Sequence, residues 1–233
     1  MNLPQLTSPE FVTKIPSTGQ EVKYRPFLVK EEKILLMALE GGDEKEITLA
    51  IMNILDACIL DDVDLRTLAT FDVEFLFLKL RGKSVGEVIE LKLSHSNKDS
   101  KCKHRTEVDI NLDDINVVGD IGNGKVQLDD TLGIKLRYAG IDDINKIEST
   151  SASQLYELVV QCVDYIYDAE NVYEDFTKEE MSDWLGQLNS TQFKKITDFY
   201  EAAPKLSHKI EWTCPECGEK DTVVLEGMQS FFM

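Results

Sequence analysis

The sequence predicts an α+β fold, in which a helical body carries β-hairpins that are joined by a zinc-ribbon-like Cys/His metal site. Three observations predict this class. Apolar residues recur at helical spacing in the stretches 30–39, 44–60 and 71–80. Apolar and polar residues alternate, as in strands, at about 87–112 and again at about 206–227. The second of these β segments contains a Cys-Pro-Glu-Cys-Gly motif, whose two thiols are spaced to bind one metal ion.

Length and charge limit the kind of protein. The chain has 233 residues, 42% of them apolar, which is enough for a sizeable core in a single domain over 1–233. Its formal net charge is -18, from 43 acidic and 25 basic residues. This charge disfavours nucleic acid and anionic membranes as partners and favours a basic protein surface. We expect neither a signal peptide nor a membrane span, because no stretch approaches the ~18 apolar residues that a span needs.

The N-terminal third is predicted to hold one strand and three helices after an irregular start over 1–20. Their expected ranges are Glu21–Phe27 for the strand and Lys30–Leu39, Glu44–Leu60 and Phe71–Leu80 for the helices. Gly41 and Gly42 are expected to end the first helix. The third helix is apolar on nearly every side, which is typical of a buried helix.

The rest of the chain is predicted to alternate between strands and helices. The expected strands are Glu87–Leu93, Thr106–Leu112, Lys125–Leu128, Gly133–Ala139, Leu206–Trp212 and Thr222–Leu225. The expected helices are Ser151–Tyr167, Thr177–Leu188 and Thr191–Ala203. Thr177 and Glu180 have the spacing of a capping box, which indicates the start of the second of these helices.

The metal site needs two ligands beyond Cys214 and Cys217, because a structural zinc ion takes four. Cys102, at the start of the second strand of the 87–112 segment, is the predicted third ligand. His104 is the preferred fourth ligand, with His95 as the alternative. Zinc is the expected metal, and an iron–sulfur cluster is the alternative. No group of residues has the spacing of a catalytic centre, so we do not expect an enzyme.

Several long strings of residues carry a family resemblance. They are Lys23–Lys33 (KYRPFLVKEEK), Thr70–Glu87 (TFDVEFLFLKLRGKSVGE), and the closing Cys-Pro-Glu-Cys-Gly with Leu225-Glu226-Gly227 and Phe231-Phe232. Together they resemble the T-even-type phage baseplate protein family. The family's Cys motifs map onto Cys214 and Cys217, with Cys102 in the first hairpin.

The resemblance implies a structural or assembly component of the baseplate hub of a contractile-tailed phage. Such a component acts through contacts with other hub or tail proteins, in the host cytoplasm during assembly, and it either stays in the virion tail baseplate or leaves it. One alternative is therefore a transient hub chaperone that is absent from the virion. A zinc-dependent enzyme is the other alternative, and it would need an open coordination position on the metal.

Tyr24, Arg25 and Phe27 are the predicted partner-binding residues. They flank Pro26 in a short strand or turn, and aromatic and arginine side chains are frequent anchors of protein interfaces. The alternative is that these side chains only brace the first helix.

Overall fold

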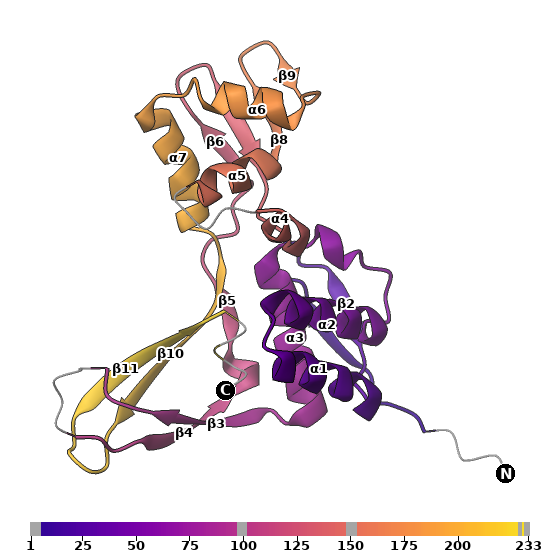
Figure 1. The fold of residues 1–233 in the computed structure, drawn as a ribbon, viewed down its shortest axis with the longest axis vertical. Helices are drawn as coiled ribbons and strands as arrows, with labels where there is room; N and C mark the ends of the chain where they lie inside the picture. The colour runs from indigo at the N-terminus through magenta and orange to yellow at the C-terminus, as the bar shows by residue number, and fades with distance from the viewer. Residues whose placement is uncertain (1–5, 97–101, 148–152, 228–229, 231–233) are drawn as a thin grey trace. The chain divides into compact units, whose positions relative to one another are not determined.

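The computed structural model describes residues 6–96, 102–147, 153–227 and 230 (Figure 1). It combines helices with antiparallel sheets, which confirms the predicted α+β class. Contacts divide the chain into two compact units, one made of Met1–Leu65, Phe71–Val118 and Lys205–Met233 and the other of Arg66–Thr70 and Gly119–Pro204. That the two units fold together as one domain over 1–233 stays a prediction. In the described part of the chain, no helix has both the length and the apolar character to cross a membrane.

The first unit contains a β-hairpin, three helices and a set of five strands. Its elements in chain order are β1 (Phe11–Lys14), β2 (Glu21–Tyr24), α1 (Val29–Gly41), α2 (Glu44–Cys58), α3 (Thr70–Val85), β3 (Val88–Leu93), β4 (Thr106–Asn111), the 3-10 turn η2 (Leu112–Asp114), β5 (Asn116–Val118), β10 (Lys205–Thr213) and β11 (Lys220–Glu226). Strand β1 lies in the stretch that was expected to be irregular and pairs antiparallel with β2. The 3-10 turn η1 (Leu65–Thr67) lies where the chain passes to the second unit.

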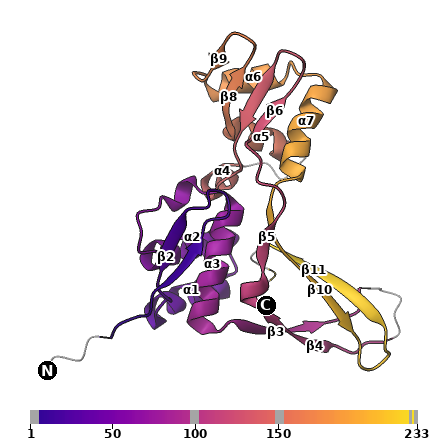
Figure 2. The ribbon, with the colours of Figure 1, turned by 180° about the vertical axis from the view of Figure 1, so that it is seen from behind.

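We use the name β module for β3, β4, β5, β10 and β11. Strands β3 and β4 form one antiparallel hairpin, and β10 lies between β11 and β5 in a three-stranded sheet. Figure 2 shows the long β10–β11 hairpin in yellow beside β3 and β4. One hydrophobic core joins the two hairpins to α3. Its buried members include Phe75, Leu78, Leu91, Leu93, Ile110, Leu112, Leu206, Ile210, Trp212 and Leu225.

The boundary between α1 and α2 follows from two local residues. Gly42 has a φ of 71°, a left-handed conformation that favours glycine, and its amide bonds to the Ala38 carbonyl. Asp43 then caps α2, since its carboxylate accepts a hydrogen bond from the Lys45 amide at 2.8 Å. The predicted end of the first helix is therefore confirmed. The predicted burial of the third helix is confirmed too, because Phe77, Leu78 and other apolar side chains around α3 are buried.

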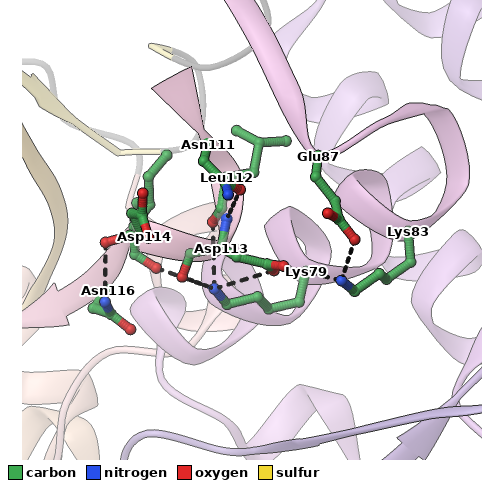
Figure 3. A network of polar contacts seen from close by, with 9 residues as sticks. Lys79, Lys83, Glu87, Asn111, Leu112, Asp113, Asp114 and Asn116 are labelled. Carbon is green, nitrogen blue, oxygen red and sulfur yellow. Dashed lines mark hydrogen bonds and ion pairs between the residues drawn. The ribbon is translucent and has the colours of Figure 1, made fainter. Parts of the chain in front are cut away.

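Two lysines of α3 hold the turn that connects β4 to β5 (Figure 3). The Nζ of Lys79 donates to the backbone carbonyls of Leu112, Asp113 and Ile115 at 3.3, 2.9 and 3.3 Å. Lys83 bonds to the carboxylates of Glu87 and Asp113. The Lys79 side chain is only 11% exposed, and its burial lowers the pKa of the ammonium group. The two lysines thus attach the β module to the helical body of the same unit.

Lys79→Met should lower the free energy of unfolding by about 1–3 kcal/mol, because it removes the donor that three carbonyls of the turn share while keeping the apolar stem. Chemical denaturation of the variant and the wild type measures the difference. Lys33→Met, at an exposed position of α1, is the matched control and should change stability by less than about 0.5 kcal/mol. Equal effects of the two substitutions would show that the Lys79 contacts do not stabilise the fold.

The second unit packs helices against a four-stranded antiparallel sheet with the order β6-β7-β8-β9. Its elements are β6 (Lys125–Gln127), β7 (Gly133–Leu136), α4 (Ile141–Asn145), α5 (Gln154–Gln161), β8 (Val163–Tyr167), β9 (Val172–Tyr173), α6 (Lys178–Leu185) and α7 (Ser190–Glu201). The capping box is confirmed, since the Thr177 hydroxyl accepts from the Glu180 amide and the Glu180 carboxylate accepts from the Thr177 amide.

The expected helix over Ser151–Tyr167 is only partly right. Ser151 lies outside the described residues, α5 ends at Gln161, and the remainder is strand β8, which pairs with both β7 and β9. The side chains of β8 are β-branched or aromatic at most positions, and such side chains favour strands. The amide of Arg137 donates to the Cys162 carbonyl at 2.9 Å, so the chain already pairs with its neighbour where the helix ends.

Candidate metal centre

The structure brings one histidine and three cysteines together from two hairpins of the β module. His95 follows β3 and Cys102 precedes β4, while Cys214 and Cys217 lie in the turn between β10 and β11. The ligand atoms of these four residues all lie within 4.8 Å of one another. Cys102 and Cys214 are 112 positions apart in the sequence, so the core and strand pairing of the β module create this arrangement.

The turn that carries Cys214 and Cys217 has the local geometry of a metal-binding knuckle. Strand pairing ends at Thr213 and Lys220. Within the turn, the Cys214 amide donates to the Glu219 carbonyl, and the Gly218 amide donates to the Cys214 carbonyl, both at 2.9 Å. Gly218 has a φ of 72°, which a residue with a Cβ rarely adopts. The loop therefore closes on itself.

Two separations between donor atoms match those around a single tetrahedral ion. The Sγ atoms of Cys102 and Cys214 are 3.8 Å apart, and the Sγ of Cys217 is 3.4 Å from Nε2 of His95. Metal–ligand bonds of about 2.3 Å to sulfur and about 2.0 Å to nitrogen, at tetrahedral angles, give S–S distances of about 3.8 Å and S–N distances of about 3.5 Å. The four donors thus lie close enough together to hold one metal ion.

The His95 ring is held in a defined orientation. Its side chain is 2% exposed, and its centroid lies 5.2 Å from the ring of Trp212. The other ring nitrogen, Nδ1, makes no hydrogen bond to a described residue, and it lies 3.6 Å from Oε2 of Glu219 and 3.8 Å from Oδ2 of Asp221. The Asp221 carboxylate accepts from the amide and hydroxyl of Ser96 at 2.7 and 2.8 Å, and these bonds lower the pKa of Asp221. A carboxylate that accepts a hydrogen bond from the far nitrogen is the usual means of orienting a metal-binding histidine, and both of these carboxylates lie just beyond that distance.

Sequence reasoning did not identify Asp221 as part of this site. The residue pairs with Trp212 across the β10–β11 hairpin, and it reaches His95 only because the two hairpins pack together. Its position four residues after Cys217 is the only local signal in the sequence.

The local environment shifts the pKa values of the two thiols of the knuckle in opposite directions. Burial raises the pKa of Cys214, but hydrogen bonds from the amides of Cys217 and Glu216 outweigh it and lower that pKa to about 6. For Cys217, the Glu219 amide lowers the pKa, whereas burial and the thiols of Cys214 and Cys102 raise it overall. Neighbouring thiolates repel each other, so a bound cation would remove this conflict.

The structure places the alternative ligand, His95, and not the preferred His104, beside the three thiols. His104 is exposed and lies outside the group of four, whereas the alternative, His95, belongs to it. The segment that contains His104 leads directly into β4. The positions of the donor atoms therefore support His95 as the fourth ligand of the candidate site.

The predicted partner-binding residues, Tyr24, Arg25 and Phe27, contact other parts of the same chain. Tyr24 and Phe27 are buried, with 5% and 8% of their surface exposed. The guanidinium group of Arg25 donates to the carbonyls of Pro26 and Ala57, both at 2.9 Å, and to the carboxylate of Glu31 at 3.1 Å. Glu31 is itself buried and accepts from the Leu28 amide at the start of α1. These contacts favour the alternative interpretation, in which the three residues brace the first helix, since the segment also pairs with β1 and Tyr24 bridges to Ile59 after α2.

Arg25→Met should lower the free energy of unfolding by about 1–3 kcal/mol, since it leaves the buried Glu31 carboxylate with only the exposed Lys30 as its cation. Thermal and denaturant unfolding of the variant measure this loss. The control is Arg66→Met, which removes the exposed ion pair with Asp142 and should cost less than about 1 kcal/mol. A stable Arg25→Met protein would contradict the bracing role.

Comparisons with known proteins agree with one another. The sequence model of a family described as T4 bacteriophage base plate protein matches residues 8–233. The baseplate hub assembly protein gp26 of Enterobacteria phage T4 is 26% identical over 216 residues, which cover 91% of this chain and 92% of that protein. No solved structure matches the chain. The family match includes both units and all four residues of the candidate metal centre.

Proposed function

Since the chain belongs to the T4 bacteriophage base plate protein family, we propose that it serves the assembly of the baseplate hub of a contractile-tailed phage. In this role it acts through contacts with other hub or tail proteins, in the host cytoplasm while tails assemble. The observation that carries the proposal is the similarity to a hub assembly protein along nine-tenths of both chains. The net charge of -18 supports a basic protein surface as the partner.

The proposed role is structural and not catalytic. Three thiols and one imidazole supply four protein ligands, the number that closes a structural zinc site. A zinc enzyme keeps one position open for water or substrate. The similarity to an assembly protein also supports a structural role.

Zinc is the metal that we assign to the site. Mixed sulfur and nitrogen ligands in a tetrahedral arrangement are typical of zinc. The ligands of an iron–sulfur cluster bind different irons, so their donor atoms surround a larger group. Here all four donor atoms lie within 4.8 Å of one another, which suits a single ion. When bound, the ion would connect the β3–β4 hairpin to the β10–β11 hairpin.

Asp221→Asn tests the orientation of His95 in this site. The substitution keeps the size of the side chain but removes the more buried of the two carboxylate charges near Nδ1, so zinc affinity should fall about 10-fold. Competition with a chromophoric chelator measures the affinity. Asp109→Asn, at an exposed position of β4, is the matched control and should leave it unchanged. Unchanged affinity in the Asp221 variant would exclude this carboxylate from the site.

A phage that lacks the gene tests the proposed function directly. We expect infected cells to accumulate tail components without complete baseplate hubs, and a plasmid copy of the gene to restore infectious particles. Normal tails in the absence of the protein would overturn the proposal. Mass spectrometry of purified virions then separates a hub subunit, which leaves peptides in the particle, from an assembly chaperone, which does not.

A further inference from the structure

The first two helices expose more apolar surface than the fold requires. Helix α1 leaves five large apolar side chains exposed among its 13 residues, namely Val29, Ile34, Leu36, Met37 and Leu39. Exposed apolar residues are ordinary when they are scattered, but a contiguous group marks a contact surface.

A groove between α1 and α2 supplies the continuous site. It has a volume of about 370 Å³, and its exposed walls are Ile34, Met37 and Leu49, with exposed fractions of 48%, 61% and 57%. Two buried alanines, Ala38 and Ala50, also line it. Small residues of this kind let another chain approach the two helices closely. A groove with apolar walls along two packed helices suits a third helix, which would insert side chains at positions i, i+3, i+4 and i+7.

The charge at one end of the groove indicates which kind of helix could bind there. The end of α1, the turn that follows it and the start of α2 carry four exposed carboxylates, against one lysine, Lys45. They are Glu40, Asp43, Glu44 and Glu46. Glu46 also lines the groove. A helix with basic residues at the end that meets this turn would complement the charge.

We propose that the groove between α1 and α2 binds an amphipathic helix of another baseplate protein, with basic residues at one end of that helix. This inference rests on the proposed function and names the partner's chemistry. A second copy of this chain is a poor occupant, because two molecules that each carry a net charge of -18 repel one another. The groove also lies apart from Tyr24 and Phe27, whose side chains are buried.

The experiment co-expresses the chain with each baseplate hub protein of the same phage, one at a time, and purifies the complexes. The test variant is Met37→Gln/Leu49→Gln, which makes two groove walls polar while glutamine keeps a good helix propensity. The matched control is Leu36→Gln, on the same helix and 53% exposed but outside the groove lining. Thermal unfolding of each free variant verifies that it is folded, and Leu49→Gln alone replaces the double variant if that one unfolds.

We expect the wild type and Leu36→Gln to form the same complex, and the double variant to bind at least tenfold more weakly. Added salt should also weaken the wild-type complex. The proposal is wrong if the double variant binds normally, if no hub protein binds, or if the groove pairs with a second copy. Complementation of the gene-deleted phage keeps the two proposals separate. If the protein is needed but the double variant restores assembly, only the groove proposal fails; if the protein is not needed, the proposed function fails.

Discussion

Cys214→Ala is expected to prevent the β module from folding and to abolish the binding of one metal ion per chain. Zinc–ligand bonds supply folding free energy directly, about 10–16 kcal/mol in small zinc-binding peptides. A typical domain is stable by only about 5–15 kcal/mol, so loss of the ion is a large fraction of the total. A bound ion would also close a loop of more than a hundred residues between Cys102 and Cys214, which would restrict the unfolded chain.

Elemental analysis and circular dichroism of freshly purified, reduced protein measure these two effects. The controls are Cys58→Ala and Cys162→Ala, whose thiols are buried in the core and are not part of the cluster. Each control should keep its metal and lose only about 1 kcal/mol. Equal metal loss in all three variants would show that the cysteines are wrongly assigned. Wild-type protein that contains no metal would remove the site altogether.

His95→Ala should lower zinc affinity by more than about 100-fold, while His104→Ala leaves it unchanged, since only His95 lies among the three thiols. The first variant leaves three ligands and an open position, whereas the second removes an exposed ring. Chelator competition measures the affinity, and cobalt substitution reports the ligand geometry through its visible absorption. A reversed order of the two variants would favour His104 and contradict the arrangement of the hairpins.

Much of the fold could be predicted because its elements are encoded locally. Short local patterns of apolar and polar residues predict the helices α1, α2 and α3 and the strands of the β3–β4 and β10–β11 hairpins. The capping box at Thr177 likewise depends on residues only three positions apart. Strand β8 could not be predicted, because its apolar pattern also fits a helix and the pairing with β7 decides the outcome. The short strand β1 forms only because β2 pairs with it.

The sequence by itself determined the paired thiols of Cys214 and Cys217, because a turn of a few residues brings them together whatever the rest of the chain does. It also determined Cys102 as the third candidate, through the hairpin that carries it. Only the tertiary structure selected His95 over His104 and placed Asp221 behind it. Only the tertiary structure, likewise, decided that Tyr24 and Phe27 are buried. These outcomes depend on how hairpins and helices far apart in the sequence pack, and packing across such distances leaves no local pattern of residues to read.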